Sequence, residues 1–205
     1  MVINRRKRAD APLMLSRAFT LFTLLSVPLL FGCGQIVRPL SAADSRLPSE
    51  AKQRIADAED AVLIAQSRFR DAKLNFERAI QRNIKFERKP PNLGDATNLA
   101  RQLNIAKVNL AELETRYATV NQKLSQNRLK LVYAQTSMRY DIAVYDLVPL
   151  DQSVDSLRTS LLELRKQKKK AQAEMKSVAD KWWAAYQGLA QSSSTQDFWV
   201  HELVQ

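Results

Sequence analysis

The side chains that most often carry catalysis are scarce in this chain. Its 205 residues contain one histidine, His201, and one cysteine, Cys33. This pair does not supply the several nitrogen and sulfur ligands of a typical zinc site, and no glycine-rich phosphate loop follows a strand. Carboxylates stand four residues from arginines, as in Glu50 and Arg54, a spacing that supports a solvated helix surface. We therefore expect no enzyme activity, no cofactor and no metal.

Cys33 ends a leader that has the parts of a secretory signal. Residues 1–17 hold five basic side chains and one acid, and the fourteen residues 18–31 carry no charge. As a helix the uncharged run reaches about 21 Å, less than the roughly 30 Å hydrocarbon core of a membrane. The leader ends in Leu30-Phe31-Gly32-Cys33, which resembles the lipobox of bacterial lipoproteins.

This resemblance implies that a signal peptidase removes residues 1–32 and that Cys33 is then acylated. The protein would lie in the bacterial cell envelope, anchored to a membrane by lipid and facing the periplasm. Gly34 follows the cysteine and favours the outer over the inner membrane. Two alternatives stay open: cleavage after Ala43, which would release a soluble secreted or periplasmic protein, and an uncleaved membrane anchor.

Net charge suggests the chemistry of a partner. The chain carries +11, and about +7 stays after the leader is removed. A basic surface attracts polyanions, which in an envelope are lipid headgroups or anionic cell-wall polymers, so we do not expect nucleic acid. The densest basic run offers a candidate contact for such a polymer: Lys166, Lys168, Lys169 and Lys170. The alternative interpretation of the run is a solvated helix face.

Hydrophobic spacing predicts an all-α fold. Apolar residues recur in alternating steps of four and three over about 49–88, 96–148 and 151–190, as in coiled coils. We expect an elongated antiparallel three-helix coiled-coil bundle over 49–191, preceded by a tether over 33–48. The first seam places an alanine at every seventh residue from Ala51 to Ala79, which predicts close approach of a neighbouring helix.

Several seam positions carry specific expectations. Asn127 and Asp141 interrupt the second seam, so each either fixes register or leaves the seam wet. The third seam is out of phase with the second, which favours a turn at Pro149 over a kinked helix. Lys168 falls on the third seam and should extend its ammonium group to the surface. Trp182 and Trp183 lie 100° apart on a helix, so one of them should enter the core.

The C-terminal tail, 192–205, follows a serine-rich stretch and ends in an apolar cluster. Phe198, Trp199 and Leu203 are candidate contacts for a partner, unless the tail folds back on the bundle. Together these features predict a non-enzymatic scaffolding lipoprotein that presents surfaces to an envelope protein or a cell-wall polymer. An accessory helical subunit of a periplasmic transport or efflux assembly, a polyanion binder and a homo-oligomer are the alternatives.

Overall fold

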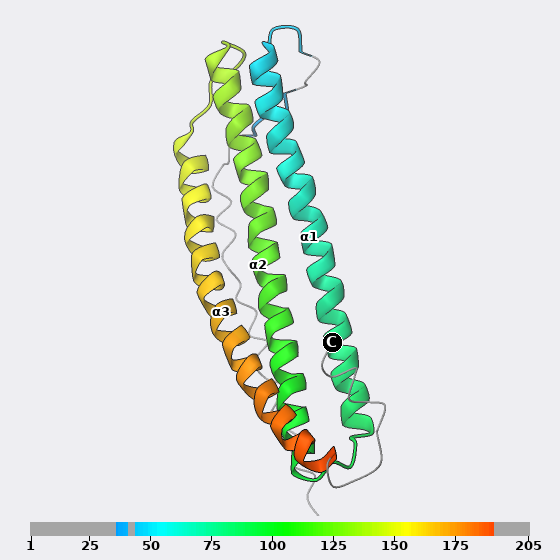
Figure 1. Cartoon of the computed structure of the whole chain (residues 1–205). Coiled ribbons are helices and arrows are strands. Elements are labelled where there is room, and N and C mark those ends of the chain that lie inside the picture. Colours follow the sequence, from blue (N-terminus) through cyan, green and yellow to red (C-terminus); the bar gives the residue numbers. More distant parts are fainter. Residues whose placement is uncertain (1–35, 41–43, 191–205) are drawn as a thin grey trace, which may run out of the picture. The chain divides into compact units, whose positions relative to one another are not determined.

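The computed structural model describes residues 36–40 and 44–190, and this part of the chain contains three helices and no strand. Helix α1 spans Ser49–Arg88, α2 spans Asp95–Arg139 and α3 spans Val148–Ala190. Their lengths are about 60, 68 and 65 Å at 1.5 Å per residue. Helix α2 packs against both of the others (Figure 1). The expected all-α three-helix bundle is confirmed.

Contacts between the helices run in opposite orders, so neighbouring helices are antiparallel. Between α1 and α2, Arg54 pairs with Gln135 and Arg101 pairs with Glu87. Between α2 and α3, Asn127 Nδ2 donates to Ser153 Oγ at 2.8 Å, and Leu103 shares a core cluster with Trp182. The polar seam position Asn127 therefore joins two helices through a hydrogen bond.

The predicted seams of α1 and α3 are confirmed by burial. Every seam position from Ala51 to Ala79, and from Val154 to Ala185, is buried or half-buried. The alanines of α1 also allow the expected close approach, because Thr115 Oγ1 on α2 lies 3.1 Å from the main-chain oxygen of Ala72 and shares its hydrogen between that oxygen and Ala111 O of its own helix, at 2.9 Å. A side-chain hydroxyl thus reaches the backbone of the neighbouring helix.

The second helix is shorter than the spacing predicts, because α2 ends at Arg139 and not at 148. Asp141 takes a left-handed backbone conformation with φ of 53°. Its N–H donates to Met138 O, and Ile142 N–H donates to Ser137 O at 2.8 Å. These two bonds form the Schellman motif that ends many helices, and Asp tolerates the left-handed region better than most residues. Asp141 is therefore a turn residue, and its predicted place on a helical seam is wrong.

The turn between the second and third helices precedes Pro149 and does not begin there. Residues 140–147 connect the helices, and Pro149 lies in the first turn of α3, where proline loses no helical hydrogen bond. The side chain of Asp146 accepts from Val148 N–H at 3.0 Å at the start of this helix. The expected break is present, about nine residues earlier than the sequence places it.

The segment before α1 is packed where a free tether is expected over 33–48. Leu40 and Leu47 are 8% and 3% exposed and belong to a core cluster with Ala51, Ile55 and Tyr133. Arg38 N–H donates to the hydroxyl of Tyr145, in the loop after α2, at 3.2 Å. We call residues 36–40 and 44–48 the strap. The strap is held because its leucines remove apolar surface from water.

A second cluster joins all three helices near the turn between α1 and α2. It contains Phe86 of α1, Ala100 and Leu103 of α2, and Trp182 of α3. Trp182 is 1% exposed and Trp183 is 45% exposed, so one of the adjacent tryptophans enters the core as expected. This end of α3 is thereby fixed against both α1 and α2.

Candidate functional site: a basic groove between α2 and α3

A groove lies between α2 and α3 beside the basic run of α3. Lys168 of this run occupies a position on the otherwise apolar seam. Lys168 is half-buried, and its Nζ lies 3.2 Å from Glu114 Oε1 and 5.8 Å from the ring centroid of Tyr117. The carboxylate and the aromatic face together stabilise an ammonium group that the seam would otherwise leave among apolar side chains. Lys168 is therefore held in an ion pair that joins α2 and α3.

An open groove of about 180 Å³ lies around this contact. Its lining residues come from one position on α2 and four on α3: Tyr117, Arg165, Lys168, Lys169 and Gln172. Arg165, Lys169 and Gln172 are exposed. The groove therefore presents three cations against one carboxylate, Glu114, and that carboxylate is already paired with Lys168. Its chemistry suits an anion.

The helix divides the predicted basic run between two faces. Residues 165, 169 and 172 fall on one side of the seam, within about 60° of one another at 100° per residue. Lys166 and Lys170 lie on average about 100° further around the helix and do not line the groove, and Lys170 Nζ lies 3.9 Å from Glu174. Of the four lysines selected from the sequence, the structure brings Lys168 and Lys169 together in the groove, and the other groove residues, Arg165, Gln172 and Tyr117, were missed. Their spacing on the helix face would have identified the first two.

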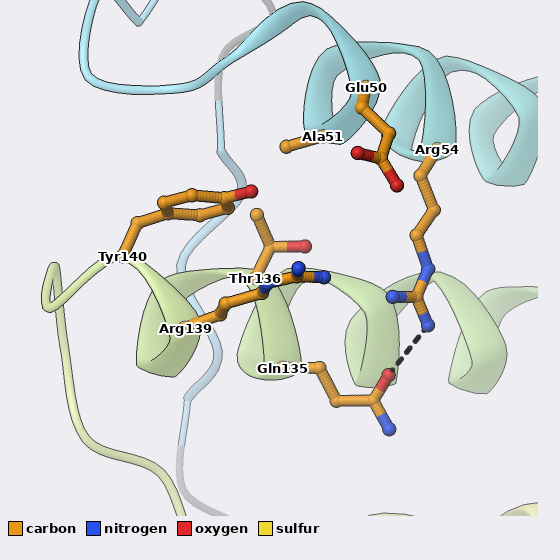
Figure 2. Close-up of a pocket in the computed structure, with 7 residues that line it drawn as sticks. All are labelled: Glu50, Ala51, Arg54, Gln135, Thr136, Arg139 and Tyr140. Carbon is orange, nitrogen blue, oxygen red and sulfur yellow. Dashed lines mark hydrogen bonds between the residues drawn. The ribbon is translucent and has the colours of Figure 1, made fainter.

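A second, smaller pocket lies between the start of α1 and the end of α2 (Figure 2). Arg54 Nη2 donates to Gln135 Oε1 at 3.1 Å across it, and the guanidinium of Arg139 lies 5.9 Å from the ring centroid of Tyr140. Its free volume is about 40 Å³, enough for roughly one or two water molecules. This pocket is a polar seam between helices, and we do not assign it a ligand.

Two titratable side chains at the α1–α2 interface have shifted pKa values. Burial, and then a hydrogen bond to Glu59, raises the pKa of Tyr133 to about 12, and the Tyr133 hydroxyl lies 2.7 Å from Glu59 Oε1. Burial, and then the charge of Arg82, lowers the pKa of Lys107. Both shifts follow from helix packing, and neither group lines the basic groove.

Among the described residues, no three histidine, cysteine, aspartate or glutamate side chains are grouped so that they could hold a metal ion. None of the helices in this part of the chain combines the length and apolar character required to cross a membrane. Cys33, and the tail residues Phe198, Trp199, His201 and Leu203, lie outside the described residues.

Comparison with known proteins finds no match to a protein family, to a curated protein or to a solved structure.

Proposed function

We propose that this chain is a non-enzymatic structural lipoprotein of the bacterial cell envelope. Its lipid, attached at Cys33, would hold one end at a membrane, and its three helices would present surfaces to a partner in the periplasm. The observation that carries this proposal is the order of the parts: a lipobox-like leader that ends at Cys33, followed by three long helices, of which the first begins at Ser49. That order suits an anchored scaffold.

The helix surfaces support the scaffolding part of the proposal. On α1, Leu63, Ile64 and Leu74 are 61%, 53% and 49% exposed, although the seam of the same helix is covered by α2. Leu63 and Leu74 are eleven residues apart and therefore lie on one side of the helix, three turns from each other. Exposed apolar side chains on one face often mark a contact with another protein.

Acylation is tested by growing cells with radioactive palmitate and comparing the natural protein with Cys33→Ser. We expect the label on the natural protein and its complete loss in the variant. A variant that keeps the label, or a natural protein that never takes it, contradicts the lipid anchor. Mass spectrometry of the mature N-terminus then separates cleavage before Cys33 from cleavage after Ala43.

The scaffold is tested with a photo-crosslinking amino acid at Leu63 in living cells, with exposed Arg68 on the same helix as the matched control. One dominant envelope-protein adduct at Leu63, much weaker at Arg68, supports the proposal. Adducts to a second copy of the chain would identify a homo-oligomer, and adducts to a transport component would identify the accessory subunit. Equal, diffuse labelling at both positions contradicts a scaffolding role for this face.

A further inference from the structure

The cations around the α2–α3 groove belong to a longer stripe on α3. Arg158, Arg165, Lys169 and Lys176 follow one another in steps of seven, four and seven residues, which keeps them on one side of the helix. The other members of the stripe between Arg158 and Lys176 are Leu162 and Gln172, so no acid interrupts it. The spacing along the axis is about 6–11 Å between neighbouring cations.

Ion pairs within the protein involve one end of the stripe and the neighbouring Lys168, and they leave the cations in the middle of the stripe accessible to a ligand. At one end Arg158 Nη1 lies 2.8 Å from Asp155 Oδ1, on its own helix. In the middle the carboxylate of Glu114 is used by Lys168, while the side chains of Arg165 and Lys169 are exposed at the rim of the groove. The ring of Tyr117, over which Lys168 Nζ lies at 5.8 Å, and the amide of Gln172 also line the groove.

We propose that this groove binds a linear anionic glycan, with Arg165 and Lys169 contacting its carboxylate or phosphate groups. The proposal rests on the proposed envelope function, because the compartment determines which polyanion the stripe meets. A row of cations about 6–11 Å apart matches a polymer that carries many charges better than it matches a single small anion. An aromatic ring beside polar groups is suited to a sugar, since one sugar face is apolar and its edge carries hydroxyls.

The experiment measures binding of the full mature chain, in neutral detergent, to polygalacturonate, with uncharged dextran as the reference polymer. The groove variant is Arg165→Gln with Lys169→Gln. The matched control is Lys166→Gln with Lys170→Gln, which removes two charges from positions that lie outside the groove, on average about 100° around the same helix from the groove pair. All four side chains are exposed, so both variants should keep the helical circular dichroism of the natural protein.

We expect the groove variant to bind polygalacturonate about tenfold more weakly, and the control variant to lose less than about threefold, since two direct charge contacts amount to roughly 1–2 kcal/mol at low salt. Binding should weaken steeply as salt is raised. Equal losses in the two variants would show attraction to overall charge and would overturn the site. No binding by the natural protein, or stronger binding to anionic lipid vesicles than to the polymer, would also overturn it.

This outcome is separable from that of the proposed function. Loss of palmitate labelling in Cys33→Ser concerns the anchor alone, and the binding assay gives its answer whether or not the chain is acylated. A labelled protein whose two charge variants bind alike would retain the lipoprotein proposal and lose the glycan site.

Discussion

Replacing Trp182 should destabilise the protein far more than replacing its neighbour Trp183. Trp182 is 1% exposed and packs with Phe86 and Leu103, which come from the other two helices. Truncating a buried tryptophan to alanine costs about 3–5 kcal/mol through lost burial and the remaining cavity. The indole Nε1 of Trp182 is buried without a hydrogen-bond partner in the described part of the chain. Removing that N–H returns about 1 kcal/mol, so we expect a net loss of about 2–4 kcal/mol.

Trp183 provides the matched control, because it is the same residue type one position along the same helix. It is 45% exposed, and its ring stacks on Tyr186 with centroids 6.0 Å apart. Trp183→Ala should cost about 0.5–1 kcal/mol, because the ring contacts that it loses, with Tyr186 and Trp182, belong to a partly exposed side chain. A further variant, Trp182→Phe, keeps an aromatic ring in the cluster and removes the unpaired N–H, so its loss should be smaller than that of Trp182→Ala.

The assay is urea denaturation of each variant followed by far-ultraviolet circular dichroism, with the free energy of unfolding taken by linear extrapolation. Trp182→Ala should be at least about 1 kcal/mol less stable than Trp183→Ala. Equal losses, or a larger loss for Trp183→Ala, would mean that α3 is rotated by one residue against α2. The burial assigned to the whole third seam would then be wrong.

Three other predictions concern the α1–α2 interface and the strap. Folding raises the pKa of Tyr133 to about 12, so the stability that its neutral form contributes is complete below about pH 10 and is lost as the pH rises toward 12. Thermal melts should show this alkaline loss of stability in the natural protein and much less of it in Tyr133→Phe. Near neutral pH this variant should lose only about 1 kcal/mol, for the hydrogen bond to Glu59. Leu47→Ala should cost about 2–3 kcal/mol and speed amide hydrogen exchange in the strap, and exchange that stays unchanged would show that the strap does not depend on this side chain. Thr115→Leu should cost about 2 kcal/mol by overpacking, since the main chain of α1 lies within hydrogen-bonding distance, whereas Thr119→Leu, where the hydroxyl bonds within its own helix, should cost less in the same urea assay.

The seams were predictable because hydrophobic spacing reports burial directly. Ile55, Leu103 and Val154 fall on predicted seam positions and are all nearly inaccessible to solvent. The side of α2 that contacts α1 was not predicted, because its buried residues are small. Ala111 and Ala118, one turn on either side of Thr115, bury little apolar surface and are therefore weak in any hydrophobic pattern.

The end of α2 shows a different limit of the sequence. Apolar residues continue at seam spacing to Tyr145, and neither glycine nor proline stands between Arg139 and Val148. Asp141 takes the left-handed conformation that glycine usually supplies at the end of a helix. Its residue type did not predict this conformation, which the structure shows. Tyr145 is still buried, at 8% exposed, but it packs from the loop and binds the strap through its hydroxyl. The spacing therefore predicted the burial of Tyr145 correctly, but it placed this residue in a helix and not in the loop.

Only part of the basic groove follows from the run Lys166–Lys170, because a run along the chain does not lie on one face of a helix. Neighbouring residues of a helix point 100° apart, so a dense run of charge distributes over every face. The cations that share a face are separated by three, four or seven residues, as Arg165, Lys169 and Lys176 are. Applying the helical period to charge, as was done for apolar residues, would have selected the stripe from the sequence.

The packed strap sets a geometric limit on the proposed lipid anchor. Val37 packs against the first core cluster and follows Cys33 by four residues, and four residues of extended chain span at most about 14 Å. An acyl chain on Cys33 would therefore hold this end of the helical unit against the membrane surface. Ile36 and Val144, 87% and 84% exposed, belong to the strap and to the loop bonded to it.

A polarity-sensitive fluorophore on Val144→Cys should therefore shift to the blue when the acylated chain is placed in vesicles. The same fluorophore on Asn92→Cys, in the turn at the far end of α1, should not shift, because about 60 Å of helix separates the two ends. Lys168 lies twenty residues into α3, so the basic groove would stand about 30 Å along that helix from its start near the membrane. A shift at Asn92 equal to that at Val144 would mean that the helices lie flat on the lipid, a position in which a groove of exposed cations would meet headgroups before it met a glycan.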